Sequence, residues 1–229
     1  MKSVGIIGGL GPETSAEFYL EVIFGCQKIN KDFRPLILIS NVPLPFAIER
    51  DLIKNNKGIE RYIPYLTNEA KRLEKSGVDF LVMPCNSLHI FINQIRESVK
   101  IPVLSILEET VNYIKSHRYR KIGLISTSAT IKNKIYETTF QENDIEFIVP
   151  DQLQRAEMDK IIQRLIDGIH LNKDRNAIMS VIETLKQNGA DAIALACTDL
   201  QLLLPSDDDV EIFDTMKILA DATIENLLV

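Results

Sequence analysis

The 229-residue sequence contains no tryptophan, three histidines and only three cysteines. The cysteines are Cys26, Cys85 and Cys197, an odd number without a CxxC pair. This pattern argues against a disulfide scaffold and favours a reducing cytoplasm. His89 lies four residues after Cys85, but no second pair of ligands follows at the spacing of a zinc site. We therefore expect no metal.

Long apolar runs and an excess of basic residues are also missing. No segment reaches the ~20 apolar residues of a membrane helix, and the first apolar run ends at glycines and an acid, unlike a signal peptide. The net charge of −6 and the pI of about 5.2 give no basic footprint for a nucleic acid. "GIIGGLGPE" continues as neither GxGxxG nor a P-loop, so we expect no nucleotide. The sequence predicts a cytoplasmic protein that binds neither membranes nor nucleic acids.

Short apolar runs alternate with amphipathic segments along the whole chain. Strands are predicted at "SVGIIGG", "PLILISN", "VDFLVMP" and "IPVLSI", and later at "KIGLIST", "IEFIVP", "ADAIALA" and "EIFDT". Helical stretches separate most of these strands, which is typical of βαβ units. In the predicted helix 12–30, Phe18, Val22 and Cys26 recur every four residues, so Cys26 is expected in the core. The fold class is therefore α/β, with mainly parallel sheets flanked by helices.

The second half of the chain repeats the first. When Cys85 is aligned with Cys197, glycines and aspartates in the preceding segments also coincide. The matching pairs are Gly5 with Gly123, Gly77 with Gly189, Asp79 with Asp191, and Leu88 with Leu200. We expect two pseudo-symmetric α/β domains, residues 1–97 plus 206–229 and residues 98–205, with the active site between them.

Cys85 and Cys197 both stand where a predicted parallel strand ends, which is where such sheets bind ligands. Asn86-Ser87 and Thr198-Asp199 follow them, and these residue types begin helices. A helix N-terminus would favour the thiolate and lower the thiol pKa from its usual ~8.5.

Three chemistries are open to such a pair of cysteines. The two thiols can form a redox disulfide, although redox pairs are usually close in sequence. One cysteine can act as a nucleophile with a histidine base, but His89 is awkwardly placed and the other cysteine then has no role. Two thiols can also move a proton on and off opposite faces of one carbon, which uses both.

Four segments together resemble the aspartate/glutamate racemase family: "GGLGPETSAEFY", "PCNSLH", "ISTSATIKNKIY" and "ACTDLQLLL". They occur in the family order and span essentially the whole chain. The resemblance implies a cofactor-independent amino-acid racemase with two α/β domains, which acts on aspartate or glutamate and forms a homodimer.

The resemblance also implies roles for particular residues. Cys85 and Cys197 would be the two acid/bases. The remaining positions would bind the substrate: Leu10 in the first loop, Arg50 at the distal carboxylate, Asn86, Ser87 and Thr198 at the α-carboxylate, and Thr127 and Thr130 lining the pocket. His170 stands where some members carry a substrate-binding lysine, so the preferences for aspartate or glutamate and for the L or D form stay open.

Two further functions remain as alternatives. The first is a decarboxylase or cis–trans isomerase of small dicarboxylates, within the same superfamily. The second is a non-catalytic protein that binds an acidic metabolite. His89 is expected to orient the loop of Cys85, and Asp199 to cap a helix or to meet the substrate amino group.

Overall fold

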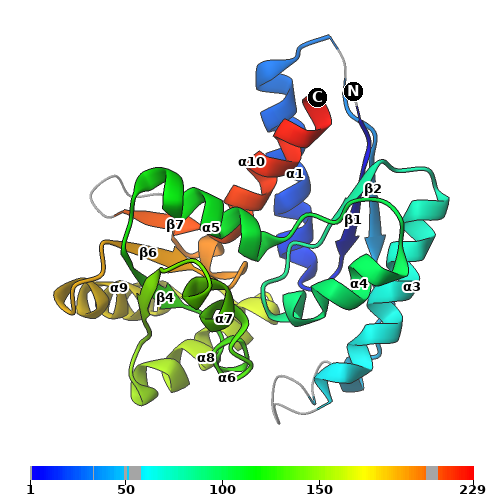
Figure 1. Ribbon diagram of the computed structural model, residues 1–229. Helices are drawn as coiled ribbons and strands as arrows, with labels where there is room; N and C mark the ends of the chain where they lie inside the picture. The colour runs from blue at the N-terminus through cyan, green and yellow to red at the C-terminus, as the bar shows by residue number, and fades with distance from the viewer. Residues whose placement is uncertain (1, 33, 49–50, 52–57, 205–210) are drawn as a thin grey trace. The chain divides into compact units, whose positions relative to one another are not determined.

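The computed structural model describes residues 2–32, 34–48, 51, 58–204 and 211–229 (Figure 1). The chain divides into two compact units, Met1–Ile106 with Leu219–Val229, and Leu107–Ile218. Each unit contains a parallel β-sheet with helices on both faces, which confirms the predicted fold class. Within the ranges given above, no helix combines the length and apolar character needed to cross a membrane.

The first unit has a three-stranded sheet in the order β2-β1-β3. Gly5 and Gly8 of β1 point to opposite faces, toward α3 at Leu73 and toward α1 at Ser15. Helix α10 packs beside α1, where Ile224 contacts Gly25 (Figure 1). The elements of this unit are β1 (Val4–Gly8), α1 (Pro12–Ile29), β2 (Ile37–Asn41), η1 (Ile59–Tyr62), α3 (Ile63–Lys75), β3 (Phe80–Val82), η2 (Ser87–Phe91), α4 (Ile92–Ser98) and most of α10 (Thr215–Leu228).

The second unit has a four-stranded sheet in the order β5-β4-β6-β7. Helices α8 and α9 pack on the face that carries Ile125 and Ile193. Helices α5 and α7 lie on the opposite face, where Tyr113 meets Phe213 (Figure 1). The elements are α5 (Ile106–His117), β4 (Lys121–Ile125), α6 (Ser128–Lys132), α7 (Ile135–Gln141), β5 (Glu146–Ile148), α8 (Gln152–Ile166), α9 (Asn172–Gln187), β6 (Ala192–Leu195), η3 (Leu200–Leu202) and β7 (Ile212–Asp214).

The internal repeat is confirmed by matching contacts inside the two units. Gly77 and Gly189 both follow a helix with positive φ, at +84° and +87°, a conformation that suits glycine at a helix end. Asp79 accepts hydrogen bonds from the backbone and side chain of Ser3, at 2.6 and 2.7 Å. Asp191 accepts two backbone N–H bonds at the equivalent strand start, from residues 120 and 121. These bonds lower the pKa of both carboxyl groups.

The units do not divide where the sequence placed the domains. "IPVLSI" was assigned to the second domain, but Val103 forms a bridge with Leu81 of β3 and stays in the first unit. The strand β7 was assigned to the first domain, but it pairs with β6 in the second. The observed units therefore change over at residues 106/107 and 218/219.

Two predicted elements also differ in the structure. "IPVLSI" makes only one bridge, because Pro102 has no N–H group to continue a ladder. The helix expected to begin at Asn86-Ser87 starts as the 3-10 turn η2, and α4 begins only at Ile92. The helix dipole expected next to Cys85 is therefore that of a single 3-10 turn and not that of a long α-helix.

Candidate active site

The predicted site residues of the first unit gather at the carboxyl edge of its sheet. Strand β1 ends at Gly8 and passes through Gly9, whose φ is +82°, to Leu10. The hydroxyl of Ser15, in the first turns of α1, fixes this loop by accepting the N–H of Gly9 and donating to the carbonyl of Gly11, both at 2.8 Å. Leu10 is partly buried against the core of the unit.

Cys85 follows β3 at the same edge, after Met83 and Pro84. Its N–H bonds to the carbonyl of Met83 at 2.8 Å, which forms a tight turn at the strand end. Asn86 is buried and Ser87 half-buried. Three predicted residues, Cys85, Asn86 and Ser87, therefore lie together, one after another, in a turn that the strand holds in place.

The side chain of His89 holds this turn through two hydrogen bonds to backbone groups. Its Nε2 accepts the backbone N–H of Ile106 at 3.0 Å, so that nitrogen carries no proton. The proton therefore sits on Nδ1, which donates to the carbonyl of Cys85 at 2.7 Å. His89 is buried, and this pair of bonds supports the orienting role rather than that of a base.

The hydrogen bonds around Cys85 also differ from those of an α-helix. In an α-helix the N–H of His89 would bond to the carbonyl of Cys85. The histidine side chain already uses that carbonyl, and the N–H of His89 bonds instead to Asn86 at 3.0 Å. The turn after Cys85 is therefore tightened by a side chain that the sequence alone did not connect to it.

The second unit builds a corresponding edge from β4 and β6, whose ends Ile125 and Leu195 are in register. Thr127 follows β4 and caps α6, because its hydroxyl accepts the N–H of Thr130 at 3.1 Å and lies 3.0 Å from the Thr130 hydroxyl. Asp159 of α8 accepts the N–H of Ser128 at 2.9 Å. Sequence reasoning missed Asp159, since nothing in its helix signals a tie to this loop.

Cys197, Thr198 and Asp199 follow β6, and all three are buried. The Sγ atom of Cys197 lies 3.8 Å from Oδ2 of Asp199, with the thiol as donor. The N–H of Leu200 bonds to the carbonyl of Cys197 at 3.1 Å and begins η3. Asp199 thus contacts the thiol itself, a role that the sequence did not assign to it.

The three thiols differ in burial. Cys26 is 1% exposed in the core beneath α1, and burial raises the pKa of its thiol. Cys85 and Cys197 are 9% and 7% exposed, so both are buried against the cores of their units, though less completely than Cys26. The prediction that Cys26 is a core residue is confirmed.

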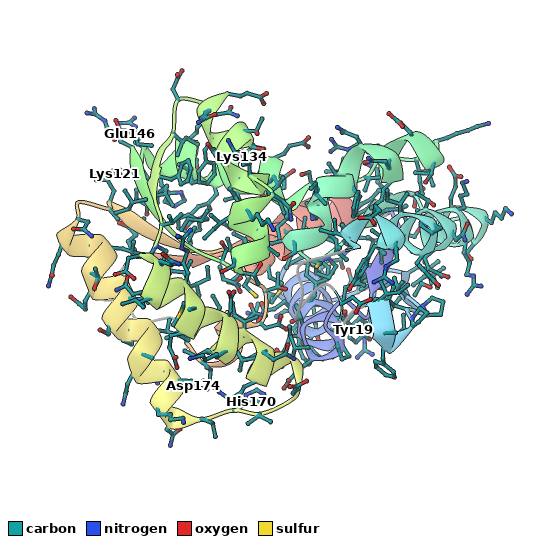
Figure 2. The ribbon with its side chains drawn as sticks, turned by 90° about the horizontal axis from the view of Figure 1, so that it is seen from below. Tyr19, Lys121, Lys134, Glu146, His170 and Asp174 are labelled. Atoms are coloured by element: carbon teal, nitrogen blue, oxygen red, sulfur yellow. The ribbon has the colours of Figure 1, made fainter. Side chains whose placement is uncertain are left out.

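Two predicted residues remain, Arg50 and His170. Arg50 lies outside the residues that the structure describes. His170 is exposed in the loop between α8 and α9, near Asp174 in sequence (Figure 2). That loop is anchored by Arg164, which binds Asp174 through two bonds of 2.8 and 2.7 Å. In the described part of the chain, no group of three or more His, Cys, Asp or Glu side chains is arranged to hold a metal ion.

Residues 7–223 match the Asp/Glu/Hydantoin racemase family. The chain belongs to this family. The resemblance drawn from the four sequence motifs is therefore confirmed. The match leaves only the first six and the last six residues outside, so both cysteine turns lie within it.

Individual relatives agree with this assignment. The broad specificity amino-acid racemase RacX of Bacillus subtilis (strain 168) is 31% identical over 98% of both chains. Among solved structures, a putative Asp/Glu racemase from Yersinia pestis has a TM-score of 0.87 and 28% identity, with all of both chains covered. An aspartate racemase homologue from Pyrococcus horikoshii OT3 has a TM-score of 0.82 and 27% identity, again over both whole chains.

Proposed function

We propose that this racemase-family chain interconverts the enantiomers of an acidic amino acid without pyridoxal phosphate, with Cys85 and Cys197 as the two acid/bases. The observation that carries the proposal is the repeat. In both units a cysteine stands at the carboxyl edge of the sheet, shortly after the strand that pairs with the first strand of the unit, β3 with β1 and β6 with β4. A binding protein would not need sulfur at both positions.

Each catalytic cycle moves one proton on and one proton off the α-carbon. A thiolate removes the α-proton as the C–H bond breaks, and the electron pair moves into the α-carboxylate. The opposite thiol then donates its proton to the other face of the carbon, and the electron pair returns to form the new C–H bond. The first sulfur ends as a thiol and the second as a thiolate, so atoms and charge balance. This chemistry requires the two sulfurs to face opposite sides of one substrate.

The neighbours of the cysteines suit the charge that develops. Asn86, Ser87 and Thr198 carry amide and hydroxyl donors next to the thiols, and we assign the α-carboxylate to them. Thr127 and Thr130, with Leu10, would line the remainder of the pocket. Arg50 is assigned to the distal carboxylate, where a guanidinium can bind both oxygens. His170 is assigned to the position of the lysine found in some members.

A broad range of amino acids is the second candidate for the substrate. RacX, similar over nearly its whole length, is named as a broad specificity racemase. Histidine as a residue type attracts a carboxylate less than lysine does, which favours a wider range of substrates. An acidic amino acid is our first choice because the aspartate racemase homologue of known structure is also similar over its full length.

Exchange of the α-proton in deuterated water tests the proposal directly. The protein is incubated with the L and D forms of aspartate, glutamate, alanine and lysine, and products are followed by NMR and chiral chromatography. We expect deuterium at the α-carbon and loss of optical purity with the acidic pair. Cys85→Ala and Cys197→Ala should each lower racemisation by at least about a hundredfold, while Cys26→Ala should not.

Other outcomes would redirect the proposal. Wild-type racemisation by both single alanine variants would eliminate the two-base mechanism. Turnover of maleate or of an arylmalonate without α-proton exchange would support the isomerase or decarboxylase alternative. Thermal stabilisation by aspartate without any turnover would support a binding protein. A fluorescent bridge formed by dibromobimane between Cys85 and Cys197 would show that the two thiols converge.

The quaternary structure and the location of the protein stay predictions. A homodimer is expected from the family resemblance, and size-exclusion chromatography with light scattering tests it. The cytoplasmic location rests on the sparse, unpaired cysteines of the sequence, and fractionation of cells tests it.

A further inference from the structure

The two cysteine turns differ at one position that touches the chemistry. Two residues after the cysteine, the first unit has Ser87 and the second has Asp199. Asp199 is 7% exposed, and its Oδ2 accepts the thiol hydrogen of Cys197 over 3.8 Å. A serine hydroxyl has no charge, so the repeat places a carboxylate beside only one of the two sulfurs at this position.

A carboxylate in this place favours the protonated form of its neighbour. The S–H group of Cys197 can donate to Asp199, whereas a thiolate would face a like charge with no proton between them. Because both groups are buried, water screens this repulsion little.

We propose that Asp199 is a positioning residue that keeps Cys197 as the thiol and so makes the two acid/bases unequal. The inference rests on the proposed racemase function. In the resting enzyme Cys85 is then the sulfur that accepts a proton, and Cys197 the one that donates. One enantiomer, the one whose α-hydrogen faces Cys85, meets the enzyme in its prevailing form.

The inequality has a particular kinetic form. Two enantiomers in water have equal free energies, so kcat/KM must be the same in both directions. If the two thiols are unequal, kcat can differ between the two enantiomers. KM must then differ by the same factor, so that kcat/KM stays equal. Removal of the Asp199 charge should bring the two kcat values closer together and should leave the equality of kcat/KM intact.

The protonation of each thiol is measured without turnover. The full-length protein is alkylated with iodoacetamide across a range of pH, and mass spectrometry of peptides gives a separate profile for each cysteine. We compare the pH midpoint of each alkylation profile and not the alkylation rate at a single pH, because a thiolate of lower pKa is also a weaker nucleophile. Where alkylation is slow, the ultraviolet absorbance of the thiolate supplies the same midpoint.

The substitution Asp199→Asn keeps the shape and an acceptor oxygen but removes the charge. We expect the midpoint of Cys197 to fall by about one pH unit, a tenfold change in the thiolate fraction, while that of Cys85 stays in place. Glu183→Gln removes a charge from the exposed side of α9 in the same unit and should move neither midpoint. The reciprocal change Ser87→Asp should raise the midpoint of Cys85.

These outcomes separate the two proposals. An unchanged Cys197 midpoint in Asp199→Asn, or an equal change in Glu183→Gln, would overturn the role of Asp199 even in an active racemase. The expected shifts in a protein that exchanges no α-proton would keep the Asp199–Cys197 pair and remove the racemase function. If Asp199→Asn fails to fold, as judged by circular dichroism, an unmoved Cys85 midpoint in Ser87→Asp overturns the inference.

Discussion

His89 offers a sharp test of how the turn of Cys85 is held. Its ring bonds to two buried backbone groups, the carbonyl of Cys85 and the N–H of Ile106. Replacement by phenylalanine keeps the ring volume and leaves both groups without this partner. Each buried group left unsatisfied costs about 1–3 kcal/mol, so we expect His89→Phe to lower the free energy of unfolding by roughly 2–6 kcal/mol.

Two further variants divide this loss. The amide nitrogen of His89→Asn stands near the place of Nδ1 and can still donate to the carbonyl of Cys85. The amide oxygen of His89→Gln reaches toward the place of Nε2 and can still accept from Ile106. Each should therefore recover part of the stability lost in His89→Phe. Urea unfolding and thermal melting measure the differences, at about 2–4 °C per kcal/mol for a chain of this size.

The activity readout links this stability to the thiol. Because the bond from Nδ1 ends on the carbonyl of Cys85 itself, His89→Asn should retain more α-proton exchange than His89→Gln. Wild-type stability in His89→Phe would refute the reasoning, since the two bonds would then contribute nothing. Equal exchange in the Asn and Gln variants would show that the histidine does not orient Cys85.

Three other changes test the scaffold. Gly123→Ala would place a Cβ 2.5 Å from the Cδ1 atom of Ile193, and we expect overpacking to cost about 1–3 kcal/mol in urea unfolding. Asp191→Asn should cost about 1 kcal/mol at about pH 7. The pKa of Asp191 is lowered on folding by its backbone bonds. Its contribution to stability is therefore present above its ordinary pKa and is lost as the pH falls through the lowered pKa. We expect Asp191→Asn and the wild type to be equally stable at about pH 2 and the variant to be less stable at about pH 7. Arg164→Ala leaves the 2%-exposed carboxylate of Asp174 without its guanidinium and should cost about 3–5 kcal/mol, which a melting curve near the wild-type one would contradict.

Sequence reasoning succeeded where local chemistry decides the structure. The predicted helix 12–30 is observed as α1, which begins at Pro12, and Phe18, Val22 and Cys26 are among its buried residues. Gly77 follows the end of α3 and adopts the positive φ that favours glycine at this position. In these cases the determining contacts lie within a few residues along the chain.

It failed where a distant residue decides. The ring of His89, which bonds to the carbonyl of Cys85, is also held by the N–H of Ile106, seventeen positions further along the sequence. The loop of Thr127 is tied to Asp159 on another helix. The bridge between Val103 and Leu81 joins residues more than twenty positions apart and places Val103 in the first unit, on the other side of the predicted boundary at 97/98. Periodicity carries no information on such contacts.

Some residues that match between the two halves have a structural reason to match, and others do not. Gly5 and Gly123 match because a Cβ at either would meet a side chain of the neighbouring strand within 2.7 Å. Asp79 and Asp191 match because each accepts bonds at the start of a first strand. No such constraint demands sulfur after β3 and β6.

The main-chain bonds of the two turns, from Cys85 to Met83 and from Leu200 to Cys197, do not involve the cysteine side chains. The backbone bonds of the two turns do not call for sulfur, and a reaction that uses both thiols supplies a reason for their recurrence. The difference between Ser87 and Asp199 fits the same logic. A position that the scaffold leaves open is where the two halves can diverge, so each half can hold its own thiol in the protonation state that its part of the reaction needs.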